Sequence, residues 1–312
     1  MVAMKTKNNI FKTFMKSKNT NFSFFNIEKL IKQKKDSDIK EEDTINLDEV
    51  HKELNSLVGL DNIKELIAEI NAFVNINKKR KENNLTTDQL VFHMIFSGNP
   101  GTGKTTVARI LGKFFYSMGV LGKGQVIEVE RADLVGEFVG QTAQKVKVKI
   151  EEAIGGILFV DEAYSLARGG DRDFGKEAID TLVKTMEDRK DEFILILAGY
   201  NREMEYFLSS NPGLRSRFPI HLKFNDYSMD ELMNIADLIA KKRQYEITLE
   251  GKRELLNIII QKQVGKQNEK FGNAREVRNI IEKAIRRQAL RISEKKLITK
   301  DDLIYIKSED FI

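Results

Sequence analysis

Two short segments of the chain combine residue types and spacings that suit the chemistry of nucleoside triphosphates. Residues 98–105 read Gly-Asn-Pro-Gly-Thr-Gly-Lys-Thr, a G-x-x-x-x-G-K-T phosphate-binding loop. Residues 157–162 read Ile-Leu-Phe-Val-Asp-Glu, an apolar run that ends in two carboxylates, as expected where a buried parallel strand opens into a binding site. The first segment offers N–H groups and a lysine to phosphate, and the second offers a magnesium ligand and a base for water. Together they predict hydrolysis of a nucleoside triphosphate.

The residue types of the phosphate-binding loop give each position an expected role. Its glycines let the backbone approach phosphate oxygens without a Cβ in the way, and the helix that follows directs its positive dipole end at the anion. Lys104 is expected to reach the β- and γ-phosphates, and the Thr105 hydroxyl to bind Mg²⁺. A chance glycine turn is disfavoured by the apolar strand before the loop and the helix after it. The expected nucleotide contacts of the loop are Gly98, Asn99, Pro100, Gly101, Thr102, Gly103, Lys104, Thr105 and Thr106.

The two carboxylates have separate expected roles. Asp161 is expected to hold the magnesium ion, directly or through a water ligand, and Glu162 to polarise the attacking water. The alternative is an ordinary pair of acids at the surface end of a strand. The chain has no cysteine, and its three histidines lack the spacing of metal ligands, so magnesium held with phosphate is the only metal expected.

A further polar pair follows the apolar strand expected over residues 193–198. Tyr200 or Asn201 is placed to contact the γ-phosphate or the water, because both follow directly on the strand end. The alternative is a simple strand-to-helix turn in which Asn201 caps a helix.

Three arginines, far from the loop in sequence, are candidates for phosphate contacts. Arg215 and Arg217 lie in a stiff segment between Pro212 and Pro219 and suggest an arginine finger that reaches a neighbouring subunit's γ-phosphate. A surface salt bridge is the alternative. Arg275 opens a long helix and is expected to reach back to the phosphates of its own chain, the alternative being an exposed helix arginine.

The segment over residues 133–142 follows the second expected strand and carries Phe138 and Val139 between glycines. Such a phenylalanine either packs into the core or is displayed to grip another molecule, and the segment alone favours neither.

The order of apolar and polar segments predicts an α/β fold with a small helical addition. The five expected strands cover residues 91–97, 125–130, 157–160, 193–199 and 220–224. Helices are expected over 54–77 with an interruption at 58–61, and over 105–118, 143–153 and 176–188. Strands joined by helical crossovers predict a parallel sheet covered on both faces. Only helices are expected afterwards, over 230–243, 251–262 and 275–292, with a short element at 301–306.

These patterns divide the chain into an N-terminal extension at 1–47, an α/β domain at 48–225 and a small all-α lid domain at 226–312. Residues 1–35 are basic, with a charge of +8, and residues 36–53, which cross into the start of the α/β domain, are acidic, with a charge of −6. The basic part of the extension is expected to be a flexible leader, with contact to phosphate or anionic lipid as the alternative. Residues 22–31 fit a short amphipathic helix, and residues 36–46 an acidic linker.

Composition limits the class of protein further. Of the residues, 41% are hydrophobic, and no run approaches the length that a transmembrane helix needs. The N-terminus lacks the apolar core of a secretory signal, so a cytoplasmic location is expected. Of the formal net charge of +5, residues 1–53 carry +2 and the remaining residues +3, so the body is nearly balanced and does not favour nucleic acid as a partner.

With these residues in hand, the chain resembles the AAA+ ATPases, and within them the group that contains stage V sporulation protein K and the red-type Rubisco activase. The resemblance favours the sporulation branch and covers most of the chain, from about residue 54 to residue 306. Its motifs lie at residues 58–60 (Val-Gly-Leu), 98–105, 131–142, 156–167, 168–183, 198–200 (Ala-Gly-Tyr) and 211–218.

The resemblance implies a homo-oligomeric ring, usually a hexamer, with ATP and Mg²⁺ at the subunit interfaces and a protein client in the central pore. It implies that Lys104, Thr105, Asp161 and Glu162 act as described above. Arg217 is implied as the likeliest finger with Arg215 able to share the role, Arg275 as the second sensor, and Phe138 as the pore-loop aromatic. Val58 and Gly59 match the stretch that borders the adenine. Many members have asparagine as first sensor, whereas here Tyr200 occupies that position and Asn201 comes one later.

Two other functions stay open at this stage. A DNA-linked AAA+ motor would need a basic stripe through the pore or an added DNA-reading module, which the nearly balanced body does not favour. A nucleotide-dependent assembly scaffold would need ATP but no gripping residue. A Rubisco activase-like role is compatible with the resemblance as well.

Overall fold

The computed structural model describes residues 46–87, 91–168, 173–265 and 271–312. The predicted leader, the amphipathic helix over 22–31 and almost all of the acidic linker lie outside the described residues.

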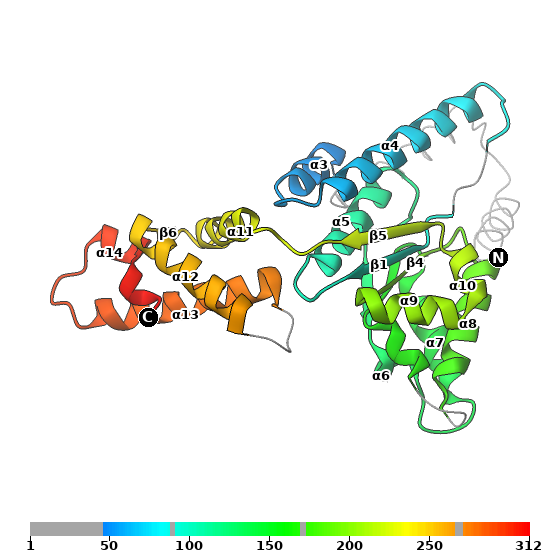
Figure 1. Ribbon diagram of the computed structural model, residues 1–312. Coiled ribbons are helices and arrows are strands. Elements are labelled where there is room, and N and C mark those ends of the chain that lie inside the picture. Colours follow the sequence, from blue (N-terminus) through cyan, green and yellow to red (C-terminus); the bar gives the residue numbers. More distant parts are fainter. Residues whose placement is uncertain (1–45, 88–90, 169–172, 266–270) are drawn as a thin grey trace, which may run out of the picture. The chain divides into compact units, whose positions relative to one another are not determined.

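Five parallel strands form the central sheet: β1 (Met94–Gly98), β2 (Val126–Val129), β3 (Ile157–Val160), β4 (Ile194–Gly199) and β5 (Ile220–Phe224) (Figure 1). Their order across the sheet is β2-β3-β4-β1-β5, and every neighbouring pair is parallel. The predicted five-stranded parallel sheet is therefore confirmed. Parallel neighbours bring all carboxyl ends of the strands to one edge, which is where ligands bind in sheets of this kind.

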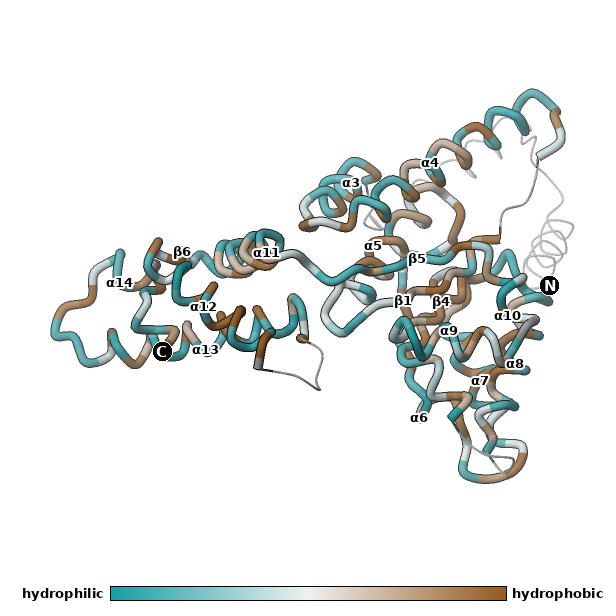
Figure 2. The backbone as a smooth tube through the Cα atoms, viewed as in Figure 1, coloured by the Kyte–Doolittle hydropathy of each residue, from teal (hydrophilic) through white to brown (hydrophobic). Residues whose placement is uncertain are grey.

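The strands are buried because each lies between two apolar cores. Successive residues of a strand point to opposite faces, so Met94 and Phe96 of β1 join one core while Ile95 joins the other. The same alternation continues along β3 and β4. In Figure 2 the middle strands β1 and β4 are coloured as hydrophobic, which is the pattern of a sheet covered on both faces.

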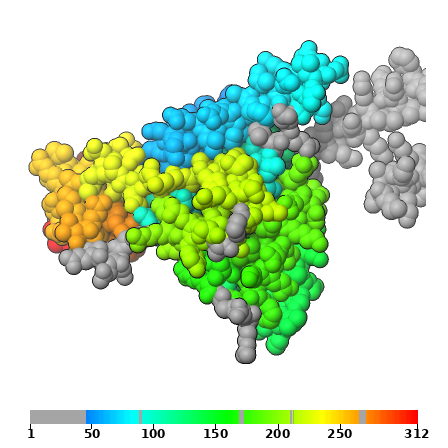
Figure 3. All heavy atoms as spheres, turned by 45° about the vertical axis from the view of Figure 1, so that its right-hand side comes forward, coloured from blue at the N-terminus to red at the C-terminus, as the bar shows by residue number. Residues whose placement is uncertain are grey.

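Helices cover both faces of the sheet. One core takes its helical residues from α3 (Leu47–Asn55), α4 (Asp61–Glu82) and α5 (Lys104–Ser117), and Figure 3 shows α3 and α4, blue to cyan, as one continuous band of surface. The other core takes them from α6 (Arg131–Leu134), α7 (Gln141–Ala153), η1 (Ala163–Ala167), α8 (Gly175–Asp188), α9 (Asn201–Ser210) and α10 (Pro212–Arg217). The short elements α6, η1, α9 and α10 are additions to the predicted pattern.

The C-terminal residues form the predicted helical lid around a third core. Its main helices are α11 (Met229–Lys242), α12 (Leu249–Gly265) and α13 (Asn273–Ser293). Ser228 begins α11 with a capping box, in which its side chain accepts from the Glu231 N–H. The lid also holds an unpredicted pair of short parallel strands, β6 (Glu246–Ile247) and β7 (Tyr305–Ile306). In the described part of the chain, no helix is long and apolar enough to cross a lipid bilayer.

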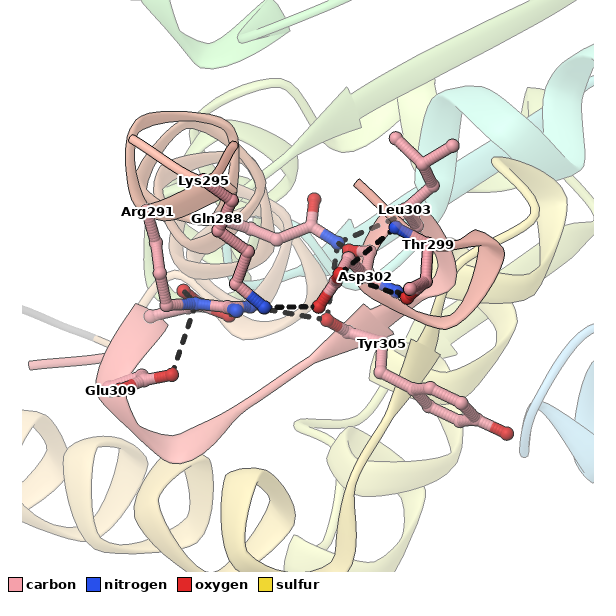
Figure 4. A network of polar contacts seen from close by, with 9 residues as sticks. Gln288, Arg291, Lys295, Thr299, Asp302, Leu303, Tyr305 and Glu309 are labelled. Atoms are coloured by element: carbon pink, nitrogen blue, oxygen red, sulfur yellow. Dashed lines mark hydrogen bonds and ion pairs between the residues drawn. The ribbon is translucent and has the colours of Figure 1, made fainter. Parts of the chain in front are cut away.

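A polar network fixes the end of the lid (Figure 4). The buried Gln288 amide donates to the carbonyls of Asp302 at 2.9 Å, Leu303 at 3.3 Å and Tyr305 at 3.1 Å, where α14 (Lys300–Ile304) runs into β7. Arg291 pairs with the buried Asp310 through two hydrogen bonds of 2.8 and 2.9 Å. The Gln288 bonds supply partners for backbone carbonyls at the C-terminal end of α14 and at the first residue of β7.

Candidate nucleotide site

The candidate site lies where β3, β4 and β1 end side by side. The phosphate-binding loop follows β1, the pair Asp161 and Glu162 follows β3, and Tyr200 follows β4. Because β4 lies between β1 and β3, Tyr200 emerges between the loop and the carboxylates. Sheet topology therefore gathers residues that are about a hundred positions apart in sequence.

Two glycines of the loop are required by its backbone. Gly103 has a φ of +99°, in the left-handed region that favours glycine. A Cβ at Gly98 would lie only 2.5 Å from the Phe224 carbonyl oxygen of β5. The loop therefore packs closely against the last strand and then turns sharply into α5.

The start of α5 offers free N–H groups to an anion. Its N-cap is Gly103, which has no side chain to accept from them, and the first turn contains no acidic residue. The first backbone bond of this region joins the Val107 N–H to the Gly103 carbonyl at 2.9 Å, which leaves the N–H groups of Lys104, Thr105 and Thr106 at the open end of the helix. An uncapped helix start beside a lysine fits a phosphate group. Thr105 is half-buried, Thr106 is exposed, and Thr102 is buried with its hydroxyl donating to the Asn99 carbonyl at 2.8 Å.

The Lys104 ammonium lies folded against its own loop. It donates to the carbonyls of Gly98 at 2.8 Å and Asn99 at 2.9 Å. Burial lowers the pKa of Lys104 below its usual range, and the nearby negative charge of Asp161 opposes this shift. Arg275 lowers the pKa further, while Glu162 and Asp226 raise it. An anionic phosphate is a stronger hydrogen-bond acceptor for this half-buried ammonium than the neutral carbonyls are.

The two carboxylates differ in their surroundings. Asp161 is half-buried, and its Oδ1 accepts from the Glu162 N–H at 2.9 Å. Glu162 is exposed and has a φ of +47°, a left-handed conformation that costs a non-glycine residue energy and recurs at functional sites. With the Thr105 hydroxyl across the site, the Asp161 carboxylate supplies the oxygen ligands that magnesium prefers. The residues present therefore fit Mg²⁺.

Tyr200 contacts the carboxylate proposed to act on water. Its hydroxyl donates to Glu162 Oε1 at 3.3 Å, and its ring lies 5.6 Å from that of Tyr164 between centroids. Burial raises the pKa of Tyr200, and the negative charge of Glu162 raises it further, so the phenol stays a proton donor. The Lys104 ammonium lies 5.9 Å from the centre of the same ring.

Asn201 lies elsewhere. It is the first residue of α9 and lines a cavity of about 180 Å³ together with Ser97, Arg215 and His221. Tyr200 occupies the N-cap position of that helix, and no side chain caps it, so Asn201 does not play the capping role offered as an alternative. Geometry brings Tyr200 to the carboxylates and leaves Asn201 out.

The arginine pair sits on α10, the short helix between α9 and β5. Arg217 donates to Glu187 of α8 at 2.5 Å and to the Gly213 carbonyl at 2.7 Å, which is the salt bridge offered as the alternative to a finger. Both side chains of this pair are partly exposed, at 33% and 50%, and such pairs contribute only about 0.2–1 kcal/mol. Arg215 is exposed and forms no ion pair with the residues that the structure describes.

Three further predicted residues lie on other elements. Arg275 is exposed at the start of α13 and close enough to Lys104 to lower its pKa. Val58 packs against the lid core, and a Cβ at Gly59 would lie 2.2 Å from the Glu231 carboxylate of α11. The segment predicted to border the adenine therefore lies between the α/β domain and the lid.

Phe138 and Val139 are displayed and do not belong to the core. Their exposed fractions are 66% and 87%. The loop that carries them is anchored before its tip, where the Gly136 N–H donates to the buried Thr142 hydroxyl at 3.0 Å, and after it, where the Gln141 N–H donates to the Phe138 carbonyl. Of the two options that the sequence left open, core packing is excluded.

Three residues near the loop were missed as site residues: Asp226, Tyr227 and Asn273. The Tyr227 hydroxyl donates to the Thr102 carbonyl at 3.2 Å, and Asp226 and Asn273 bind the loop through side-chain hydrogen bonds. The first two directly follow the last strand of a parallel sheet, a position that carries function in such folds. Asn273 lies two residues before Arg275. Their positions after the last strand and near Arg275 could have marked these three residues in the sequence.

Comparison with family models defines the class of protein. Residues 94–226 match the model of the ATPase family associated with various cellular activities (AAA), and residues 228–312 match that of the AAA lid domain. The chain therefore belongs to the AAA+ ATPases, and it is an enzyme that binds ATP with Mg²⁺ and hydrolyses it. Proteins of this family typically form oligomeric rings.

Individual proteins similar to this chain indicate which part of the family it resembles most. Stage V sporulation protein K of Bacillus subtilis is 54% identical over 264 residues, which cover 85% of this chain and 82% of the relative. The chloroplastic ribulose bisphosphate carboxylase/oxygenase activase of Cyanidioschyzon merolae is 41% identical over 269 residues, 85% of this chain and 90% of that protein. The crystal structure of the FIGL-1 AAA domain shares the fold with a TM-score of 0.54 at 18% identity, covering 82% of this chain and 79% of that one.

The contact between Tyr200 and Glu162 leads to a test of the first-sensor position. Tyr200→Phe removes the hydroxyl that orients the carboxylate, and kcat should fall about 10-fold, because a hydrogen bond to a charged group contributes about 1.5 kcal/mol or more. ATP affinity should change little. Asn201→Ala is the matched comparison and should keep kcat near wild type. Steady-state ATPase assays decide, and a larger loss of kcat in Asn201→Ala would reverse the assignment.

Proposed function

We propose that this chain acts in the cytoplasm as a subunit of a hexameric AAA+ ring that uses ATP hydrolysis to remodel a protein client in its central pore. The observation that carries the proposal is the convergence of Lys104, Asp161, Glu162 and Tyr200 at one edge of the sheet, combined with an exposed Phe138 loop. The first group suits nucleotide chemistry, whereas the Phe138 and Val139 side chains are exposed and belong to none of the core clusters of the described residues.

Each residue's part in hydrolysis follows from its place. The open start of α5 and the Lys104 ammonium bind and orient the triphosphate, and Lys104 exchanges its carbonyl partners for phosphate oxygens. Thr105 and Asp161 would hold Mg²⁺, which when bound neutralises charge on the phosphates. Glu162 accepts a hydrogen bond from the attacking water and polarises it, while the Tyr200 hydroxyl holds the carboxylate in place.

The arginines of α10 are proposed to act on the neighbouring subunit. Within one chain Arg217 is tied to Glu187, and the weak, partly exposed pair can be exchanged for a γ-phosphate at little cost. Arg215 is exposed beside it and can share or take the role. Arg275 is proposed as the second sensor, acting on the phosphates of its own chain, and Val58 and Gly59 as the border of the adenine.

The biological setting is proposed from the relatives. The 54% identity to stage V sporulation protein K exceeds the 41% identity to the Rubisco activase, which favours a role in bacterial spore maturation. The client is a protein whose chain offers a segment to the Phe138 and Val139 side chains.

Glu162→Gln tests the catalytic core of the proposal. The amide keeps the shape of the side chain but is a much poorer base, so ATP turnover should fall about 10²–10⁴-fold while ATP binding persists. Turnover is measured by phosphate release and binding by calorimetry, with Glu69→Gln on the exposed face of α4 as the control. Equal turnover of Glu162→Gln and wild type would remove Glu162 from its role.

Mixing of two inactive variants tests whether the arginine acts between subunits. A Lys104→Ala subunit lacks its own ATP site but presents Arg217, and an Arg217→Ala subunit has the reverse defect. In a random ring from equal amounts, about a quarter of the interfaces join an intact site to an intact arginine, so ATPase activity should partly return. The same mixture with Arg215→Ala shows which arginine is the finger. Absence of recovery in both mixtures would contradict action in trans.

Phe138→Ala separates a remodeller from a scaffold. Removal of an exposed ring leaves the ATP site untouched, so ATPase activity should stay within about twofold of wild type, because isolated surface substitutions rarely exceed 0.5 kcal/mol. The variant should nevertheless fail to replace the wild-type gene in its host. Val148→Ala, an exposed apolar residue on α7, is the control. Full replacement by Phe138→Ala would favour the scaffold.

A further inference from the structure

A single carboxylate joins the phosphate-binding loop to the lid. Asp226, just after β5, accepts from the Asn99 amide of the loop at 2.9 and 2.8 Å, and from the Asn273 amide of α13 at 2.8 Å. The Asn273 amide also donates to the Pro100 carbonyl at 3.2 Å, while its oxygen accepts from the Tyr227 N–H at 3.1 Å. We call Asn99, Asp226 and Asn273 the loop–lid triad.

Asn273 is restricted in both its side chain and its backbone. It is 2% exposed, and its φ of +47° is a left-handed conformation that asparagine tolerates better than most residues. Buried polar groups are normally hydrogen-bonded. The Asn273 amide meets this condition with partners from the loop, at Pro100, and from the residues after β5, at Asp226 and Tyr227. Nothing in the proposed chemistry of Arg275 requires such a residue two positions earlier.

The backbone of the loop touches the lid at the same point. The Ala274 N–H donates to the Gly101 carbonyl at 3.2 Å. A Cβ at Gly101 would lie 2.1 Å from the Gly272 carbonyl oxygen and 2.9 Å from the Arg275 nitrogen. The two backbones therefore meet directly, without a side chain between them.

These contacts divide the loop's carbonyls between two domains. Those of Gly98 and Asn99 accept from Lys104 of the α/β domain, whereas those of Pro100 and Gly101 accept from Asn273 and Ala274 of the lid. In a planar trans peptide the carbonyl and the following N–H point in opposite directions. Holding the Pro100 and Gly101 carbonyls toward the lid therefore turns the N–H groups of Gly101 and Thr102 the other way, which makes them available to phosphate.

We infer that Asn273 is a positioning residue that orients the phosphate-binding loop from the lid, so that nucleotide affinity depends on lid position. This inference rests on the proposed ATP site. Asp226 holds the Asn273 amide and the Asn99 amide together, and movement of the lid withdraws the partners of two loop carbonyls. Nucleotide in turn favours the lid position that keeps those partners in place, because coupling between two sites is reciprocal.

Asn273→Gly is the direct test, because glycine keeps the left-handed backbone and removes only the amide. ATP and ADP should bind about 10-fold more weakly, because the amide's bonds to the Pro100 carbonyl and to Asp226, the two that hold the loop, are lost, with a similar rise in KM and a smaller change in kcat. Asp226→Ala should weaken binding to a similar degree, and the double variant should lose less than the product of the two losses, since both act in one network. Gln244→Gly, also at a left-handed position in the lid and exposed, is the matched control and should bind as wild type.

A second readout follows the lid without nucleotide. The chain has no cysteine, so Lys79→Cys on α4 and Lys241→Cys on α11 accept a unique pair of spin labels. The distance distribution should broaden in Asn273→Gly and narrow again with saturating ATP. Wild-type affinity in Asn273→Gly overturns the inference whatever the distances do, and so does weaker binding with an unchanged distance distribution. Failure of the wild-type chain itself to bind ATP would instead contradict the proposed function.

Discussion

The site depends on one constraint, which is that a cation and an open helix start must be held together at the buried end of β1. The strand cannot move, because apolar residues pack on both of its faces and β4 and β5 pair with its edges. Gly98 lies against the β5 backbone with no room for a Cβ, so the loop leaves the sheet at a fixed place. Lys104, at the first turn of α5, then folds back onto the carbonyls of Gly98 and Asn99. The rigid sheet thus determines where phosphate can bind.

The charges around the Lys104 ammonium favour a phosphate group as its partner. Burial disfavours the Lys104 ammonium and Arg275 adds to that effect, whereas Asp161, Glu162 and Asp226 oppose it. Neutral carbonyls solvate the ammonium only in part, and a phosphate oxygen is a stronger acceptor for it. Glu162 is one of these carboxylates, but it is exposed and in a left-handed conformation, with the Tyr200 hydroxyl beside it. The surroundings therefore differ between the cation that we propose binds phosphate and the carboxylate that we propose acts on water.

The lid enters the site through the backbone as much as through side chains. Gly101 and the start of α13 meet without intervening side chains, and Asp226 links the amides on either side. A small movement of the lid would therefore reach the loop, because a peptide whose carbonyl loses its hydrogen-bond partner is also free to turn its N–H group. The exposed Phe138 and Val139 lie on a loop of the α/β domain whose ends are pinned by hydrogen bonds, so a shift of the domain would carry the loop with it. In the function that we propose, nucleotide binding, lid position and the displayed loop are coupled through these contacts.

The sequence by itself determined the five strands and the helical lid and predicted the main chemical residues, because the periodicity of apolar residues and the glycine–lysine pattern of the loop are local properties. It did not determine which of Tyr200 and Asn201 meets the carboxylate, since adjacent residues at a strand end point in different directions and only the packing of α9 decides between them. It left open whether Phe138 is buried. It offered a surface salt bridge as one role for Arg217 but did not identify Glu187 as the partner, because that contact joins separate helices. The two short strands of the lid and the loop–lid triad were also invisible in the sequence. Each depends on contacts between residues of distant segments, and such contacts are decided by tertiary packing and not by the local sequence pattern.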